Sequence, residues 1–501
     1  MSLILLYRSS MFRICLALIV LPTLLAGQHS VADTRAIPLL RTIRDTIAYH
    51  HPAAQSAATR AALRLAYDDA ELTLQQLIAA PGDSIGVQDF ILTAATFQRQ
   101  LQDGHLQLRP HRSKAWKKAH KDYRRPSTYL TADDQLILVT DLPTNQDTLR
   151  KGTEILAFNG QPVADLIDQL TVFSGLNDEG YDRAARVIHS KSLAYHYQER
   201  YGYRDSLTVT YLVPETGSTR DAAIGMLVPE AADATDDPPT RSAKKRARKE
   251  TEAKLHEKFL SLKKAPDSSA WILTVRSFSD SRFKHANYGR LLKQSFAKIN
   301  ESGLGKLILD LRVNGGGDMG NARTLIRYLV DEPFVMVDEV VSTAPTAGGV
   351  GLFQKYGLYV GAGVRKRNDG YHLGYAEKVA KPMRNGFRGD LVVLVDEGTF
   401  SASTLVARTL DVMDVGVLVG TRTGGGTGTL FGGKLRKIIL GEKNELQLSL
   451  IVPVWTFKPL GATPGTVTPD VIISFTKEDL LKDISPMYTK ALEILNGDFP
   501  R

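Results

Sequence analysis

The chain has 501 residues, of which 43% are hydrophobic and 23% are charged. This length and composition are typical of a globular protein with two or three domains, and they exclude a disordered or fibrous chain. The formal net charge of +9 would favour anionic surfaces, but much of the excess lies in one run, residues 241–264, and no zinc-finger spacing accompanies it. Nucleic acid is therefore not an expected partner.

The first 32 residues have the pattern of a secretory signal peptide. Arg8 and Arg13 supply positive charge, the run CLALIVLPTLLAG is a short apolar core, and the small residues of Ser30-Val-Ala32 offer a cleavage site. The only cysteine, Cys15, lies inside this segment, so the mature chain can form no disulfide. We predict an exported protein, periplasmic or secreted; the alternative is a protein anchored in the membrane by an uncleaved signal.

Residues 33–125 form the next predicted region. Apolar residues recur at helical spacing between residues 35 and 100, which indicates an N-terminal helical region that packs on another part of the protein. Near its end, the stretch RQLQDGHLQLRP passes from a helix through Asp103-Gly104-His105 into an alternating strand. This region therefore carries a D-G-H motif between a helix and a strand.

Residues 126–229 begin and end in strand-like runs, QLILVTDL and SLTVTYLV. Between them lie a strand EILAFN, a tight turn at Asn159-Gly160 and a helix starting at VADLIDQL. This order resembles a PDZ domain with a helical insertion at 175–200; the alternative is another small α/β module. Residues 230–268 are Pro- and Asp-rich and then strongly basic, which predicts a charged linker or helix. Such a run is usually a solvated face, and a lid or an anionic docking patch at 241–264 is the alternative.

Residues 269–501 alternate between strands and helices. The predicted strands are WILTVRSF, KLILDLR and DLVVLVD, and the predicted helices are HANYGRLLKQSFAKINESG, NARTLIRYLVDE and the one that opens in the stretch DEGTFSASTLVARTLD. Continuous apolar strands separated by helices predict a mostly parallel sheet covered on both faces. Ligands of such sheets bind at the carboxyl ends of the strands, so any catalytic centre is expected there.

The first notable strand end is LILDLRVNGGGDMG, where Gly315, Gly316 and Gly317 lie between a strand and a helix. Glycines allow unusual backbone angles and close approach, so their N–H groups can face a substrate oxygen. A glycine-rich turn of this kind also suits phosphates or dinucleotides, but the spacing of a dinucleotide fingerprint or a phosphate-binding loop is absent.

The second is TFSAS, residues 399–403, which follows a strand and opens a helix. A serine there presents its hydroxyl at the edge of the sheet, and the next N–H has no intrahelical partner. Ser401 and the N–H of Ala402 would thus supply a nucleophile and half of an oxyanion hole, with the glycine turn as the other half. The alternative is that Thr399, Ser401 or Ser403 only caps the helix.

The order DLRVNGGG, TFSAS, GTRTGGG and VTPDV resembles the C-terminal-processing (tail-specific) serine peptidase family. The resemblance covers roughly residues 271–495, with the PDZ-like and helical regions before it in the family's order. It implies a multidomain α/β and α+β protein whose last domain, 269–501, has a ClpP/crotonase-like parallel sheet. It also implies that Ser401 is the nucleophile, and that Ala402 and either Gly316 or Gly317 donate to the oxyanion.

One departure from the family concerns the base. The processing branch places a lysine in a T-x-G-K-G turn, but this chain has Gly426 in that slot, and a serine without a base is a poor nucleophile near neutral pH. The D-G-H motif resembles the family's second branch, which includes the tricorn core and uses histidine. This resemblance implies that His105 is the base, and a neutral imidazole suits that role.

The acid that orients His105 is less well defined by the sequence. The tricorn-like branch has a glutamate shortly before its G-V-x-P-D turn, where this chain has Thr463 and no acid. Asp103 can share a face with His105, being two residues away on an extended segment, and Ser403 is a further supporting candidate.

The expected function is therefore an exported serine peptidase that acts on peptides or proteins, without a metal or other cofactor, since HxxxH and CxxC patterns are absent. The alternative is a catalytically inactive peptide- or lipid-binding protein on the same fold, as in interphotoreceptor retinoid-binding protein, which is related to this family.

Overall fold

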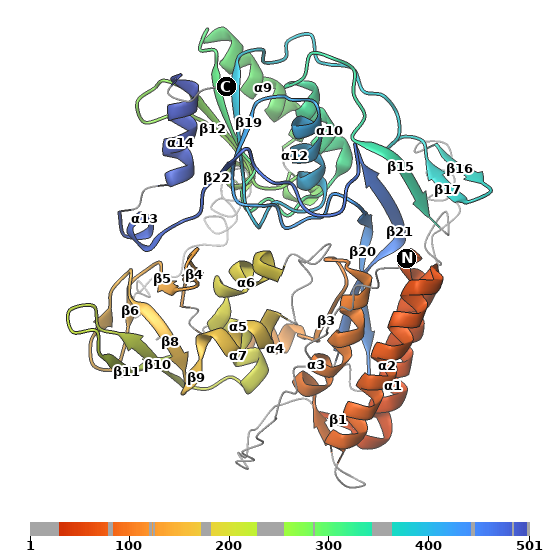
Figure 1. Ribbon diagram of the computed structural model, residues 1–501, viewed down its shortest axis with the longest axis vertical. Coiled ribbons are helices and arrows are strands. Elements are labelled where there is room, and N and C mark those ends of the chain that lie inside the picture. The colour runs from red at the N-terminus through yellow and green to blue at the C-terminus, as the bar shows by residue number, and fades with distance from the viewer. Residues whose placement is uncertain are drawn as a thin grey trace, which may run out of the picture.

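The computed structural model describes residues 30–78, 84–119, 123, 126–171, 182–227, 255–283, 286–342, 363–441, 446–482 and 485–497. Figure 1 shows three parts: the large sheet domain (residues 255–497) lies above, and the N-terminal helices and a middle domain (residues 126–227) lie side by side below it. No helix within these described ranges is both long enough and apolar enough to cross a membrane. The predicted signal core and most of the basic run 241–264 lie outside the described residues.

The N-terminal region is helical, as the spacing of apolar residues predicted. Helices α1 (Asp33–His50), α2 (Ala57–Leu77) and α3 (Val87–Gln98) share one buried core that includes Leu40, Leu74 and Phe90. The Ser56 hydroxyl caps α2 by accepting a hydrogen bond from the backbone N–H of Thr59. The end of the predicted signal peptide forms strand β1 (Ser30–Ala32), which pairs with β2 (Ser84–Gly86).

The middle domain contains an antiparallel sheet with the strand order β11-β10-β8-β5-β4. A type I′-like turn follows β8, with φ values of 46° at Asn159 and 78° at Gly160, as the Asn-Gly pair predicted. Helices α6 and α7 form in the predicted insertion. The bounds are β4 (Thr128–Leu130), β5 (Leu136–Leu138), β8 (Glu154–Phe158), α5 (Val163–Thr171), α6 (Asp182–Ser190), α7 (Leu193–Tyr201), β10 (Ser206–Leu212) and β11 (Thr219–Gly225).

The large domain is built on a six-stranded sheet with the order β12-β13-β14-β18-β19-β22, parallel except for β12. Alternate residues of β14 face opposite cores: Leu307 and Leu309 face one that includes Leu292, and Ile308 faces another that includes Met487. The sheet is therefore covered on both faces, as predicted. The bounds are β13 (Trp271–Val275), α9 (Tyr288–Glu301), β14 (Lys306–Asp310), α10 (Met319–Arg327), β18 (Asp390–Val395), α12 (Ala402–Val412), β19 (Val417–Gly420), β22 (Val471–Ile472) and α14 (Pro486–Leu495).

The end of the charged segment differs from the expectation. Residues 260–264 form strand β12 (Leu260–Lys264), not part of a linker or helix, and this strand pairs antiparallel with β13. Leu260 is buried in the core of the large domain, and all five residues of β12 pair with β13. Pairing with an existing strand therefore outweighs the helical propensity of the charged residues before it. The large domain thus begins before residue 269.

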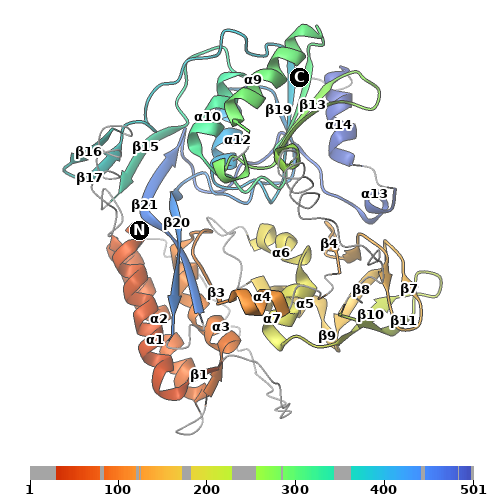
Figure 2. The same cartoon turned by 180° about the vertical axis from the view of Figure 1, so that it is seen from behind.

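A long hairpin joins the large domain to the N-terminal region. Strands β20 (Leu430–Leu440) and β21 (Leu446–Pro459) pair along their length, and one end of β21 pairs with β15 (Val337–Ser342). The other end of β21 pairs with β3 (Gln107–Pro110), the strand that follows the D-G-H motif. Figure 2 shows this hairpin descending from the large domain to the N-terminal helices. The hairpin therefore fixes the D-G-H loop relative to the large sheet.

Candidate active site

Two loops meet at the carboxyl ends of neighbouring parallel strands. Strands β14 and β18 are paired in register, so the chain leaves both at the same edge of the sheet. The backbone N–H of Phe400 donates to the carbonyl of Asn314 over 3.0 Å, and the Thr399 hydroxyl donates to the carbonyl of Leu311 over 3.1 Å. The glycine turn and the serine turn are thus tied directly to each other.

A buried ion cluster holds the glycine turn in place. Asp310, at the end of β14, accepts hydrogen bonds from the guanidinium groups of Arg276 and Arg312. Burial disfavours the charge of Asp310, but these two arginines outweigh it and hold the pKa of Asp310 well below its ordinary value. Asp310 and Arg312 of the DLR motif therefore stabilise the start of the glycine loop.

Ser401 has a strained backbone at the start of α12, with φ of 57° and ψ of −125°. A non-glycine residue rarely adopts such angles, and strain at a serine between a strand and a helix is the geometry of a nucleophile elbow. Although Ser401 stands at the N-cap position, its side chain makes no capping hydrogen bond. Ser403 is fully buried, and its hydroxyl has no hydrogen-bond partner among the described residues. The capping alternative therefore holds for neither serine.

The structure distinguishes between the two predicted glycine donors. The N–H of Gly316 donates to the side-chain oxygen of Asn314 over 2.9 Å, so this N–H is already engaged. Gly316 instead provides space: a Cβ there would lie 2.8 Å from the Cβ of Ser401 and 2.9 Å from the nitrogen of Ala402. Gly317, the next residue, is left as the better candidate donor beside the N–H of Ala402.

His105 reaches this site from the N-terminal region. It lies just before β3, and its ring packs on Phe400, the residue before Ser401, with 4.8 Å between ring centroids. Its side chain is 18% exposed, so it borders the protein surface. The structure therefore brings His105 beside the serine turn although the two residues are 296 positions apart in the sequence.

Asp103 connects His105 to a second histidine, His51. Oδ1 of Asp103 accepts from the backbone N–H of His105 over 2.8 Å and lies 3.0 Å from Nδ1 of its ring, while Oδ2 lies 3.1 Å from Nε2 of His51. Nδ1 of His51 accepts the backbone N–H of Ala53, so the proton of a neutral His51 is on Nε2 and points at Asp103. The side chains of His51 and Asp103 are 2% and 1% exposed. Burial opposes ionisation of Asp103, but the hydrogen bonds from His105 and His51 outweigh it and hold its pKa far below the ordinary value.

Two positions that carry a lysine or a glutamate in the two branches of the family are occupied by Gly426 and Thr463 in this chain. Gly426 forms a bridge with Thr466 in the turn beside the serine, where a Cβ on Gly425 would lie 3.1 Å from the nitrogen of Ser401. The backbone carbonyl of Thr463 accepts a hydrogen bond from the Thr427 hydroxyl.

Sequence reasoning missed His51, which follows helix α1 and belongs to no local motif. Only the folded structure relates His51 to Asp103.

Replacing His51 with phenylalanine is expected to destabilise the protein by about 2 kcal/mol at neutral pH, because a buried carboxylate loses a charged hydrogen bond. Asp103 has a depressed pKa in the folded protein, so its contribution is present above the ordinary value of 3.8 and is lost as the pH falls towards the folded value. Urea unfolding at pH values on both sides of 3.8 measures the difference. His50→Phe, at the adjacent position, is the control; an equal effect of both variants would contradict this role of His51.

A second ionisable cluster lies around strands β15 and β17. His372 of β17 (Gly370–Leu373) is buried, and its two ring nitrogens face Asp369 at 3.0 Å and Glu377 at 3.2 Å. Burial opposes the positive charge, but the hydrogen bonds to these carboxylates outweigh it and raise the pKa of His372 above 6.5. Glu339, Asp369 and His372 also lie close enough together to hold a cation, but Lys458 binds Glu339 at 2.5 Å. We interpret this cluster as an ion-pair network.

His372→Gln is expected to lower the thermal midpoint more at about pH 6 than at about pH 9. A raised pKa means that the charged form contributes stability below 6.5 and loses it as the pH rises through the folded value. Differential scanning calorimetry of both proteins across this range makes the comparison. A gap that widened with rising pH would contradict a protonated His372.

Comparisons with known proteins bear on the fold of the chain. The crystal structure of mature CPAF is 16% identical to this chain, covers 93% of this chain and 99% of that one, and has a TM-score of 0.59. The structure of mature CPAF complexed with lactacystin is 15% identical, covers 93% and 97%, and has a TM-score of 0.54. These similarities show a common multidomain fold. A search of curated proteins gave no match.

The sequence model of peptidase family S41 matches residues 271–447. This range contains the glycine turn and Ser401, while His105 and Asp103 precede it. The large domain, which carries the serine turn and the glycine turn, is therefore a member of peptidase family S41.

Proposed function

We propose that the chain is an exported serine peptidase that hydrolyses peptide bonds through Ser401 and His105. The observation that carries this proposal is the strained Ser401 next to Phe400, on which the His105 ring packs. The same ring is hydrogen-bonded to the buried Asp103. A serine from one segment, with a histidine and a carboxylate from another, forms the arrangement that activates a hydroxyl in unrelated hydrolases. Membership of family S41 supports a peptide or protein substrate.

The reaction begins with proton transfer to His105. Its Nδ1–H donates to Asp103, so Nε2 carries the lone pair that takes the Ser401 proton. The Ser401 oxygen attacks the scissile carbonyl, and the N–H groups of Ala402 and Gly317 hold the negative oxygen of the tetrahedral intermediate. The C–N bond then breaks, and Nε2–H of His105 gives its proton to the leaving amine. Water, deprotonated by the same nitrogen, releases the acyl group and restores Ser401.

The middle domain is positioned to take part in substrate binding. A Cβ on Gly424, in the turn beside the serine, would lie 3.9 Å from the side chain of Ala184. The rings of Tyr129 and Phe475 pack at 5.7 Å and join the same two domains. We propose that the middle domain is PDZ-like and presents the end of a peptide chain to the site. Export rests on the N-terminal charge and apolar pattern.

Digestion of an unfolded protein tests the peptidase assignment. The mature chain, residues 33–501, is incubated with reduced and carboxymethylated lysozyme, and new peptide ends are identified by mass spectrometry. We expect cleavage by the wild type and by the surface control Ser218→Ala, and none by Ser401→Ala or His105→Ala. Saturable peptide binding without cleavage would instead support the inactive binding protein.

A further inference from the structure

Strand β12 offers a backbone edge for a further strand. Among the described strands it pairs only with β13. The carbonyl of Phe259 and the N–H of Ala265 bond to the β13 side, so odd-numbered residues of this segment point their backbone groups at β13. The backbone N–H and C=O groups of Leu260, Leu262 and Lys264 therefore point outwards, where an extended peptide can pair with them.

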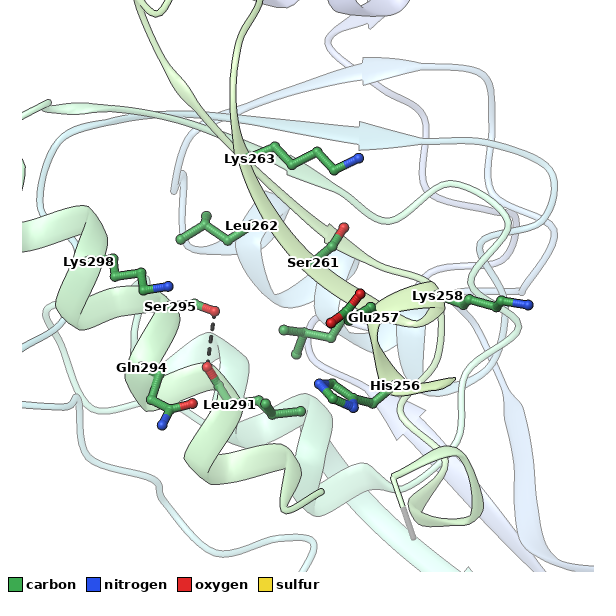
Figure 3. A pocket seen from close by; sticks show the side chains of 11 residues that line it. His256, Glu257, Lys258, Ser261, Leu262, Lys263, Leu291, Gln294, Ser295 and Lys298 are labelled. Carbon is green, nitrogen blue, oxygen red and sulfur yellow. Dashed lines mark hydrogen bonds between the residues drawn. The ribbon is translucent and has the colours of Figure 1, made fainter. Parts of the chain in front are cut away.

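Helix α9 forms a wall beside this edge. Leu291, Gln294, Ser295 and Lys298 recur at helical spacing on one side of α9 and line a cavity of about 570 Å³ together with β12. Figure 3 shows Leu262 pointing from β12 towards Lys298 and the helix, with the Ser295 hydroxyl turned back onto the carbonyl of Leu291. An edge strand beside a helix is the arrangement that other domains use to bind peptides as an added strand.

The charge of this groove defines its ligand. Lys258, Lys263 and Lys298 are exposed around it, and Glu257 is the one acidic side chain among the described residues that line it. Leu262 and Leu291 are partly buried and give it an apolar centre. An extended ligand that pairs with β12 therefore meets an apolar floor and a positively charged rim.

We propose that the groove between β12 and α9 binds an extended acidic peptide segment as an added strand on β12. Side chains of a strand alternate, so every second ligand residue faces α9. The favoured pattern is an apolar residue that packs on Leu262 and Leu291, followed two positions later by an acidic residue that pairs with Lys298. This docking site is separate from Ser401 and does not depend on the peptidase assignment.

Fluorescence anisotropy tests this proposal with the mature chain carrying Ser401→Ala, so that no cleavage occurs. The probe is a fluorescein-labelled, acetylated peptide, Thr-Val-Thr-Leu-Thr-Asp-Thr, in low salt. We expect saturable binding that Lys298→Glu weakens about fivefold or more. Lys293→Glu makes the same charge change elsewhere on α9 and is expected to leave the affinity unchanged. A probe with lysine in place of aspartate is expected to recover binding to Lys298→Glu.

The backbone contribution has its own test. N-methylation of the peptide bonds that face β12 removes donors without changing side-chain charge, and we expect it to abolish binding. Each of three results would overturn the proposal. The peptide does not bind saturably, or Lys293→Glu lowers its affinity as much as Lys298→Glu does, or the N-methylated probe binds with full affinity. Digestion results for Ser401→Ala do not bear on any of these outcomes, so the docking site and the peptidase assignment fail separately.

Discussion

Replacing Asp103 with asparagine is expected to lower kcat/KM about 10³- to 10⁴-fold, as loss of the carboxylate does in other serine–histidine hydrolases. Oδ1 of Asp103 accepts hydrogen bonds from the backbone N–H and the ring Nδ1–H of His105. Oδ2 accepts one from the Nε2–H of His51. An amide has one oxygen and one NH₂ group, so either orientation sets a donor against a donor. With the NH₂ group towards His105, the amide favours the tautomer that carries the proton on Nε2, and this nitrogen then cannot accept the Ser401 proton.

The measurement is peptide hydrolysis by Asp103→Asn beside Asp45→Asn, an exposed acid on α1. A surface ion pair contributes little, so the control is expected to keep its activity. Circular dichroism shows whether the Asp103 variant is folded. A folded Asp103→Asn variant with wild-type kcat/KM would show that this carboxylate does not orient His105 in catalysis.

Replacing Gly316 with alanine is expected to lower kcat by about 10²-fold or more, because it moves the groups that hold the oxyanion. A Cβ at this position would lie 2.8 Å from both the carbonyl of Phe400 and the Cβ of Ser401, and 2.9 Å from the nitrogen of Ala402. The φ of Gly316 is +93°, which alanine adopts only under strain. Either the start of α12 or the glycine turn must shift.

Gly315→Ala is a matched control one residue away in the same loop, since a Cβ there meets nothing within 4 Å. We expect this variant to retain most of its kcat. Steady-state kinetics on one fluorogenic peptide compare both variants with the wild type. An equal loss of kcat in both variants would show that any alanine in this loop disturbs the site. An unchanged kcat in Gly316→Ala would contradict the close contact of Gly316 with the serine turn.

The sequence predicted the large domain well because its signals are local. Strand β14 and helix α9 follow from apolar periods within single segments, and Gly303, with φ of 66°, ends the helix as expected. Strand β12 was missed because its charged context favours a helix, while a neighbouring strand decides its structure. The connection from β21 to β3 spans more than 300 residues and has no local signal at all.

The same division applies to the site. Ser401 and the glycine turn were found through paired motifs, and the D-G-H motif singled out His105 and Asp103. The particular oxygen of Asp103 that serves each partner, and the presence of His51 behind it, depend on tertiary packing. The engagement of the Gly316 N–H by Asn314 likewise follows from a loop conformation that the spacing of residues does not encode. Motifs thus singled out the groups proposed for the site, and the fold gives their relative positions.

Activation of Ser401 by His105 is tested by fluorophosphonate labelling of the mature chain, followed by mass spectrometry to locate the modified residue. We predict one adduct on Ser401, absent from Ser401→Ala and at least about 10²-fold slower to form in His105→Ala, since a serine without its base is a poor nucleophile. Folding of both variants is checked by circular dichroism. A folded wild-type protein that formed no adduct, or that formed it equally fast without His105, would contradict a serine nucleophile activated by this histidine.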